Sequence, residues 1–275
     1  MTATAAPLFN DVADGPPEAY GYWLTTEDNL RIRVGHWPAK AGRGTIFLCP
    51  GRTEYIEKYG KAARKLVQNG YGVLAIDWRG QGLSERLHKD TLLGHVSEFA
   101  EYQVDLETVM RWAAQGNAPK PWYILGHSMG GCLLTSYFIS DNNIFDKCIL
   151  CAPMVSVRAN SFSRKLVATI GLLEIFGLGE FPMQKPSWDE NEGWIRDPFL
   201  ENALTSDEIR FNRTYQLLKN NPELGVKGIT VGWLKHALRR TNEFKSTDWS
   251  KTITRPLLHL NATEDKLVNN SLNKE

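Results

Sequence analysis

Trp122-Tyr123-Ile124-Leu125-Gly126-His127-Ser128-Met129-Gly130-Gly131 passes from an apolar run into small residues and then into a helical pattern. A strand–turn–helix sequence of this kind places Ser128 on a sharp turn. Glycines two residues before and after the serine, Gly126 and Gly130, prevent collisions with the neighbouring strand and helix. The helix that follows would point its first N–H groups at Ser128, where negative charge develops during acyl transfer. The motif therefore predicts Ser128 as a nucleophile, with Gly126 and Gly130 as the glycines of its elbow.

Strand-like and helix-like segments alternate on both sides of this motif. Strands are expected at Ala19–Trp23, Arg31–Trp37, Thr45–Cys49, Gly72–Ile76, Trp122–Leu125, Lys147–Ala152 and Leu257–Asn261. Helical patterns occupy Tyr55–Gln68, Val96–Ala114 and Ser128–Ile139. Several strands are nearly continuous apolar runs, which is typical of strands covered on both faces. The sequence therefore predicts an α/β fold, with a mostly parallel sheet and flanking helices.

The alternation stops in residues 155–250, where helical periodicity replaces strand patterns at Ser161–Phe176, Asp207–Asn220 and Val231–Arg239. A structureless loop of that length is improbable, so we expect an inserted helical cap. Residues 19–154 and 251–275 would then form two parts of one core, and residues 1–18 a loose N-terminal arm. The apolar face of the segment that ends at Phe176 either packs on the core or forms an entrance for acyl chains.

Composition narrows the classes of function. The 275 residues carry a net charge of +1 and include 42% hydrophobic residues, which gives no basic field for nucleic acid. No Lys or Arg occurs in the first thirty residues, which argues against a secretory signal. The four cysteines have neither zinc-site nor disulfide spacing. We expect a cytoplasmic protein that binds no nucleic acid and no metal.

A second motif follows another apolar strand and reads Asp77-Trp78-Arg79-Gly80-Gln81-Gly82-Leu83-Ser84. Its glycines permit a tight loop, which Asp77 and Arg79 can stabilise through ion pairs and backbone hydrogen bonds. The third glycine and the helix of a dinucleotide-binding fingerprint are missing. The motif therefore favours a structural loop.

Four motifs now stand in order: Pro50-Gly51-Arg52-Thr53-Glu54, the Asp77–Ser84 loop, Leu93-Gly94-His95 and Gly126–Gly131. In this order and spacing the chain resembles the lysophospholipase and monoacylglycerol-lipase group of the α/β-hydrolase superfamily. The resemblance is strong over residues 19–154 and moderate over 250–270. It implies a serine hydrolase of lipid esters that needs no cofactor.

The resemblance assigns roles to particular residues. Ser128 would be the nucleophile and Asp265 the triad acid, with Glu264 as the local alternative. The backbone N–H groups of Arg52 and Met129 would form the oxyanion hole. Many relatives have His-Gly where this chain has Pro50-Gly51, so the loop must be stabilised differently here. The Arg52 side chain would pair with a phosphate head group or project into solvent.

A serine nucleophile needs a general base, and in this superfamily a histidine follows the acid in the chain. No histidine follows Asp265 in the 275 residues, and none of the six histidines suits the role. We therefore expect a C-terminally truncated hydrolase without its last strand and helix. A pseudo-enzyme, or a base from elsewhere in the chain or from another subunit, remains the alternative.

The sequence thus predicts a serine ester hydrolase of single-acyl lipids, either lysophospholipids or monoacylglycerols. A broad carboxylesterase, an aminopeptidase or a non-catalytic module that binds a lipid or a protein partner is the alternative. An acidic cluster in the cap would favour the peptidase, and its candidates are Glu174, Glu180, Asp189, Glu190 and Glu192. A lipid substrate also raises the question of peripheral contact with the inner face of the membrane.

Overall fold

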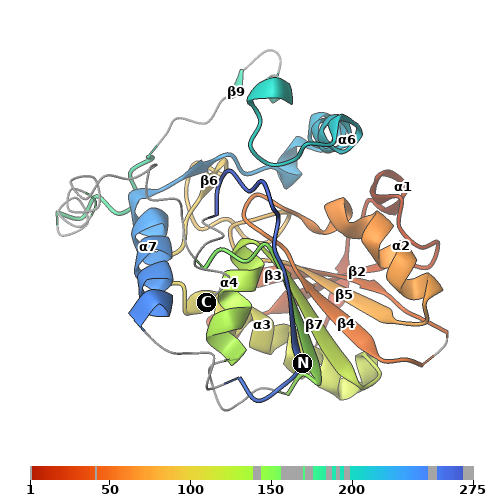
Figure 1. Ribbon diagram of the computed structural model, residues 1–275. Coiled ribbons are helices and arrows are strands. Elements are labelled where there is room, and N and C mark those ends of the chain that lie inside the picture. Colours follow the sequence, from red (N-terminus) through yellow and green to blue (C-terminus); the bar gives the residue numbers. More distant parts are fainter. Residues whose placement is uncertain are drawn as a thin grey trace.

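The computed structural model describes residues 2–40, 42–138, 144–155, 170, 176–183, 188–189, 193–194, 199–246 and 253–268 (Figure 1). One eight-stranded sheet forms its centre. Across the sheet the strands are β1 (Thr4–Ala6), β2 (Tyr20–Thr25), β3 (Arg31–Trp37), β5 (Gly72–Asp77), β4 (Thr45–Cys49), β7 (Trp122–His127), β8 (Lys147–Cys151) and β12 (Leu257–Leu260). From β5 to β12 neighbouring strands are parallel, whereas β1, β2 and β3 pair antiparallel with their neighbours. This is the mostly parallel sheet that the sequence predicts.

Helices lie on both faces of the sheet (Figure 1). They are α2 (Gly60–Gln68), which follows the 3₁₀ turn η1 (Ile56–Tyr59), α3 (Glu101–Trp112), which continues into the π-helical η2 (Ala113–Asn117), and α4 (Met129–Phe138). On β4 and β5, Phe47 and Leu74 join the large core that also contains side chains of α3 and α4. Their neighbours Leu48 and Ala75 join a smaller core with α2. Both faces of the central strands are therefore buried, as the continuous apolar runs predict.

The predicted strands are confirmed, and their ends differ from β2, β3, β4, β5, β7, β8 and β12 by at most two residues. The helix expected from Val96 begins only at Glu101. Val96 and Phe99 lie in the loop before α3, and their side chains are buried in the core. Their apolar spacing therefore reflects this burial and not a helical conformation.

Residues 1–18 differ from the loose arm expected from their composition. β1 pairs with β2, and α1 (Asn10–Ala13) packs on η1. The Asn10 side chain donates to the Pro16 carbonyl at 2.7 Å and accepts from Trp37 Nε1 at 3.1 Å. The expectation is wrong because edge-strand pairing and buried polar contacts leave little signal in composition.

The cap contains α6 (Glu208–Asn220) and α7 (Val231–Ser246), which confirms the two helices predicted there. Its short elements are β9 (Trp188–Asp189), β10 (Gly193–Trp194), β11 (Gly228–Ile229), η4 (Phe199–Glu201) and η5 (Pro222–Leu224). β11 pairs in parallel with β6 (Leu93–Gly94), which precedes α3 in the core. The cap is thus joined to the core by backbone hydrogen bonds. Most of the helix predicted at residues 161–176 lies outside the described residues.

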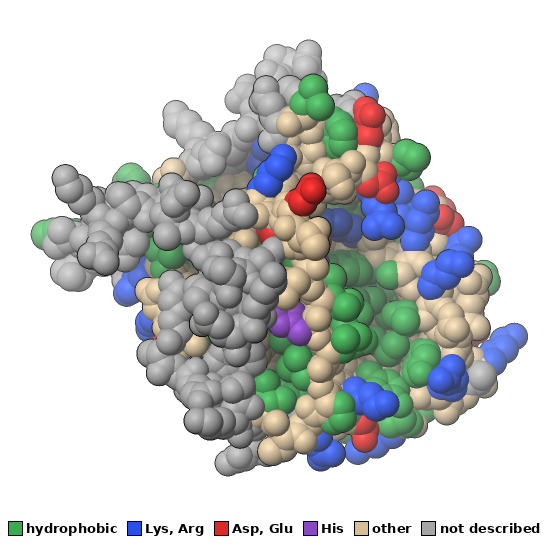
Figure 2. Space-filling view, viewed as in Figure 1, with side chains coloured by type: hydrophobic (Ala, Val, Ile, Leu, Met, Phe, Trp, Pro, Cys, Tyr) green, Lys and Arg blue, Asp and Glu red, His purple; other side chains and the backbone are tan. Residues whose placement is uncertain are grey.

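The sheet face that packs on α2 is covered unevenly. Leu125 and Ile149 on this face are half-buried, while Leu258 and Leu260 on β12 remain 52% and 45% exposed. Hydrophobic side chains gather on the surface between β12 and α2 (Figure 2). No helix within the described ranges is long and apolar enough to cross a bilayer.

Candidate active site

Ser128 occupies the turn between β7 and α4, at the carboxyl edge of the parallel strands. Its φ of +50° is in the left-handed region, where a residue with a side chain is strained. Three backbone bonds hold the turn: Ser128 N donates to Cys151 O at 3.0 Å, and Ser128 O accepts from Cys132 N and Met154 N at 3.0 and 2.9 Å. The sequence motif therefore forms the strained strand-to-helix turn expected for a nucleophile.

The two elbow glycines are required by close backbone approach. A Cβ at Gly130 would lie 2.1 Å from Cys49 O, at the end of β4. A Cβ at Gly126 would lie 2.8 Å from Gly131 N, in the first turn of α4. Both distances are below any normal carbon contact, so a larger residue at either position would displace the turn that carries Ser128.

The loop after β4 lies directly against the serine, since a Cβ at Gly51 would be 3.1 Å from Ser128 Cβ. The N–H groups of Gly51 and Thr53 donate to Glu54 Oε2 at 2.5 Å and to Gln81 Oε1 at 2.7 Å. Within the described residues, the Arg52 N–H between them has no acceptor. Met129 begins α4, so its N–H has no partner inside the helix. These are the two N–H groups that the sequence predicts for the oxyanion hole.

Glu54 stabilises this loop through its own carboxylate. Its oxygens accept from Gly51 N, from Tyr59 Oη at 2.5 Å and from Lys58 Nζ at 2.6 Å, and its Oε2 lies 2.9 Å from His127 Nδ1. Burial alone would raise the pKa of Glu54, but Lys58 and His127 lower it well below its usual range. Glu54 thus connects the Gly51–Thr53 loop to the residue that precedes Ser128. The sequence alone does not reveal that Glu54 stabilises this loop. The one indication is its position three residues after Gly51, whose N–H donates to its carboxylate.

Side chains of the Asp77–Ser84 loop stabilise the loop that carries Pro50. Trp78 Nε1 donates to Pro50 O at 2.9 Å, and Gln81 Nε2 donates to Gly51 O at 3.3 Å while its Oε1 accepts from Thr53 N. The Asp77–Ser84 loop, which follows the neighbouring strand, therefore supports the Gly51–Thr53 loop. Gln81 was not recognised from sequence, because nothing in its position within the motif indicates an amide that binds two backbone groups.

The two charged residues of the Asp77–Ser84 loop stabilise it with separate partners. Asp77 is fully buried, pairs with Arg33 at 2.7 Å and accepts from Leu83 N and Ile56 N at 2.9 Å. Arg33 also binds Glu57 at 2.8 Å. The structural role predicted for the motif is thus built from ion pairs to other elements, with no bond between Asp77 and Arg79.

Arg79 is the second of these charged residues. It forms ion pairs with Asp28, Glu101 and Asp105, the closest at 2.7 Å, and its backbone N–H also donates to Asp105. These contacts connect the loop to α3 and to the turn after β2.

Asp265 follows β12, five residues after Leu260. Strand register places Leu260 opposite Cys151, and Cys151 opposite His127, so the three strands end on one line next to Ser128. Asp265 Oδ1 accepts from Leu267 N and Val268 N, both at 2.8 Å, and Oδ2 has no donor among the described residues. Glu264 is exposed. Asp265 therefore has the more ordered carboxylate at the predicted edge.

The six histidines are all described, and none has a hydrogen bond to Ser128 within the described part of the chain. His127 is turned to Glu54, and His95 Nδ1 lies 2.8 Å from Thr230 Oγ1 at the start of α7. His88 Nδ1 accepts from Asp90 N, and His236 lies 3.2 Å from Glu98. His36 and His259 are half-buried on β3 and β12. The structure does not bring together Ser128 and a histidine base.

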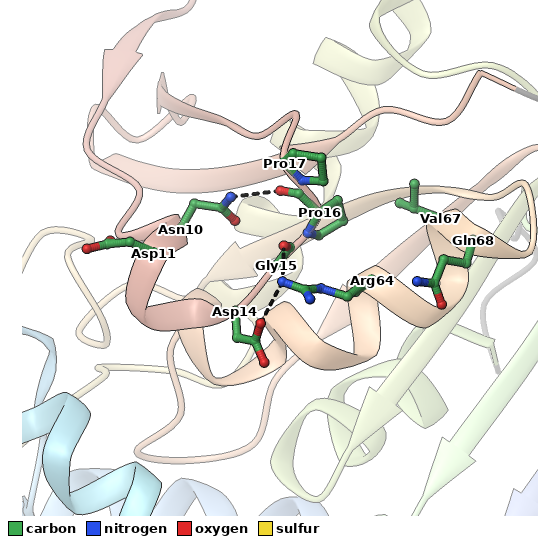
Figure 3. A pocket seen from close by; sticks show the side chains of 9 residues that line it. All are labelled: Asn10, Asp11, Asp14, Gly15, Pro16, Pro17, Arg64, Val67 and Gln68. Atoms are coloured by element: carbon green, nitrogen blue, oxygen red, sulfur yellow. Dashed lines mark hydrogen bonds and ion pairs between the residues drawn. The ribbon is translucent and has the colours of Figure 1, made fainter.

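A hollow of about 490 Å³ lies away from these loops, between α1 and α2. Figure 3 shows its lining, in which Arg64 binds Asp14 at 2.5 Å and the Gly15 carbonyl at 2.8 Å. None of its residues belongs to the loops of Ser128, Arg52 or Asp265. Since its ion pair is internal and it contains no nucleophile, it is not the candidate site. Among the described residues, no cluster of His, Cys, Asp and Glu could hold a metal ion.

The sheet order, the strained serine turn and the glycine-lined loop against it define an α/β-hydrolase. Residues 40–275 match the family described as "Serine aminopeptidase, S33". The chain belongs to this family. It is 31% identical to lysophospholipase L2 of Escherichia coli K12 over 256 residues, which cover 90% of this chain and 72% of that protein.

Other similar proteins agree with this assignment. A monoacylglycerol lipase of Mycolicibacterium smegmatis is 32% identical over 183 residues, 66% of this chain and 61% of the lipase. The structure of Paleococcus ferrophilus monoacylglycerol lipase has a TM-score of 0.68 at 19% identity and covers 88% of this chain and 82% of its own. The structure of a soluble variant of the Saccharomyces cerevisiae monoglyceride lipase has a TM-score of 0.66 at 18% identity. It covers 91% of this chain and 79% of its own. The resemblance to the lysophospholipase and monoacylglycerol-lipase group is confirmed.

Proposed function

We propose that the protein hydrolyses the ester of single-acyl lipids, lysophospholipids or monoacylglycerols, through an acyl-enzyme on Ser128. The observation that carries the proposal is the position of Ser128, strained at φ +50° with the Gly51–Arg52 loop in contact with it. Relatives named lysophospholipase and monoacylglycerol lipase support the lipid ester as substrate.

In the proposed reaction, Ser128 Oγ attacks the ester carbonyl as a base removes its proton. The N–H groups of Arg52 and Met129 hold the oxyanion, and the alcohol of the lipid leaves with that proton. Water then attacks the acyl-enzyme, and the fatty acid is released. The base would be a histidine oriented by Asp265 Oδ2, and none of the six histidines described above serves as this base.

An aminopeptidase on the same frame is the second candidate, because the family description carries that activity. Recognition of a substrate ammonium would need carboxylates in the cap. Of the five acidic candidates there, Glu180 has a described side chain, and it is exposed. The side chains of Glu174, Asp189, Glu190 and Glu192 lie outside the described residues. The lipid substrate therefore has the stronger support.

Contact with a membrane surface forms part of the proposal. Exposed apolar residues of the cap region support it, with exposed fractions from 58% to 90%, and they are Phe176, Phe181, Leu200, Leu204 and Ile209. Sedimentation with neutral phosphatidylcholine vesicles tests this contact. Binding that weakens when Leu204 and Ile209 are both replaced by Ser is expected, and equal binding would contradict it.

Hydrolysis by the full-length protein, including any residues that follow position 275 in its reading frame, and by its Ser128→Ala variant tests the proposed function. The substrates are lysophosphatidylcholine, a monoacylglycerol, a short aryl ester and an aminoacyl anilide. We expect turnover of the esters by the wild type and a loss of at least about 10³-fold in Ser128→Ala. Cleavage of the anilide alone would establish the peptidase. Binding of lipid by both proteins without turnover would establish a non-catalytic module and overturn the proposal.

A further inference from the structure

The Arg52 side chain is half-buried, and no carboxylate among the described residues pairs with its guanidinium. Its Nη1 is inaccessible to solvent and has no hydrogen-bond acceptor. The guanidinium carbon lies 5.6 Å from the ring centroid of Trp233, on α7 of the cap. Burial lowers the pKa of Arg52, and the only opposing influence among the described residues comes from Tyr102. Part of the guanidinium is therefore shielded from solvent, while the residue as a whole is partly exposed.

The carboxylates of the surrounding elements are engaged elsewhere. Glu54, two residues further along the same loop, binds Lys58, Tyr59 and His127. On α3, Glu101 and Asp105 bind Arg79. The described part of the protein thus gives Arg52 aromatic neighbours and no counter-ion. An arginine cannot discharge itself near neutral pH, so this burial is costly unless an external anion completes it.

Arg52 is also close to the reacting atom. It directly follows Gly51, which is in contact with Ser128, and its own N–H is the proposed oxyanion donor. Trp233 places α7 of the cap near the guanidinium. A substrate ester on Ser128 would therefore lie beside the loop that carries Arg52, and a short linker would be needed to bring its head group to the guanidinium. In a lysophospholipid, the glycerol unit is such a linker between the ester and the phosphate.

We propose that the Arg52 guanidinium binds the phosphate diester of a lysophospholipid head group, which makes phosphate-bearing single-acyl lipids the preferred substrates. This inference rests on the proposed function and specifies its substrate class. A guanidinium offers phosphate oxygens two parallel N–H donors, which strengthens and orients the contact. The glycerol hydroxyls of a monoacylglycerol are uncharged and would leave the buried cation without its counter-ion.

The first experiment compares kcat/KM for lysophosphatidylcholine and for a monoacylglycerol of the same acyl chain. In Arg52→Gln, the ratio of the two values is expected to fall by about 10- to 100-fold, the range for a charged hydrogen bond in a buried site. Arg52→Lys keeps the charge without the fork and should lose less. Arg43→Gln removes an exposed arginine at the opposite end of β4 and should leave the ratio unchanged.

Equal losses on both substrates in Arg52→Gln would place the side chain at the ester rather than at the head group, and would overturn the inference while the proposed function stands. If the wild type hydrolyses neither lipid, the proposed function fails. A binding experiment then still tests whether Arg52 binds the head group.

That second experiment uses Ser128→Ala and a lysophospholipid with an ether in place of the ester, below its critical micelle concentration. The ether lipid is expected to raise the melting temperature, and the matching alkylglycerol is expected to raise it less. The difference should disappear in the double variant with Arg52→Gln. Equal stabilisation by inorganic phosphate would indicate a site for free anions and contradict the head-group assignment.

Discussion

Arg79 and Arg52 follow neighbouring parallel strands, β5 and β4, and both lie among buried groups at the carboxyl edge of the sheet. The side chain of Arg79 is 1% exposed and contacts three carboxylates. Although burial alone would lower the pKa of Arg79, its bonds to Asp28 and Asp105 raise it above the usual value. Arg52 is half-buried and has no carboxylate partner among the described residues, and burial lowers its pKa.

The difference separates a structural arginine from one with capacity for a ligand. The contacts of Arg79 are complete within the chain and connect a loop to α3. The guanidinium of Arg52, in the loop that contacts Ser128, has an Nη1 without a hydrogen-bond acceptor. A buried cation without a counter-ion lowers stability, so the two arginines should respond in opposite directions to the same substitution.

Arg79→Met should have the largest effect on stability. It leaves Asp105, which is fully buried, without its cation, although burial already raises the pKa of Asp105 to about 6. We expect the free energy of unfolding at neutral pH to fall by about 3–5 kcal/mol. Urea denaturation followed by circular dichroism measures it.

The control for this substitution is Arg111→Met. Arg111 contacts Glu27 at 3.3 Å, with both side chains exposed, and its loss should change stability by less than about 1 kcal/mol. If the free energy of unfolding fell by a similar amount in both variants, the buried ion pairs of Arg79 would contribute no more to stability than the exposed pair of Arg111.

His36 is a half-buried basic group that, unlike the two arginines, can lose its proton near neutral pH. Burial lowers the pKa of His36 to about 4 from the usual 6.5, against an opposing influence of Glu18. Below pH 6.5 the unfolded chain takes up a proton that the folded state does not. The free energy of unfolding should therefore fall as the pH drops from about 6.5 to about 4, by up to about 3 kcal/mol.

Urea denaturation at a series of pH values measures this dependence. His36→Gln removes the titrating group and should flatten the curve between these two pH values, whatever its effect at neutral pH. An unchanged slope would mean that His36 titrates equally in the folded and unfolded states.

Arg52→Met should have the smallest effect, and of the opposite sign. Removal of an unpaired cation is expected to leave stability unchanged or to raise it by about 1 kcal/mol, while an apolar side chain keeps its contact with Trp233. Thermal and urea denaturation measure the change. A loss as large as that of Arg79→Met would remove the distinction between the two arginines.

The sequence predicts the sheet closely because the apolar runs of β4 and β5 are buried on both faces, and burial controls strand formation there. It also predicts the turn at Ser128, where the glycines have no substitute. The structure of the N-terminal arm could not be predicted from the sequence. β1 is a three-residue edge strand with exposed or half-buried side chains, and its pairing with β2 depends on backbone groups that every sequence has.

The contacts that support the candidate site were less predictable for a related reason. Glu54 and Gln81 act through partners 73 and 28 residues away, His127 and Thr53. Such contacts depend on which strands become neighbours in the sheet. The sequence could predict that Asp77 and Arg79 stabilise a loop, but their partners Arg33 and Asp105 were fixed only by the fold.

The hydrogen bonds of Arg86 link the cap to the core, and this affects how the cap can unfold locally. Its guanidinium, half-buried near the Asp77–Ser84 loop, donates to the carbonyls of Gly80 and Gly82 in the core and of Glu223 and Gly225 in the cap. One side chain thus belongs to both parts, and opening of the segment after α6 would remove donors from the loop that supports Gly51 and Thr53. Local unfolding of the cap and loss of order in the Gly51–Thr53 loop should then be a single cooperative event, visible in hydrogen exchange as shared protection.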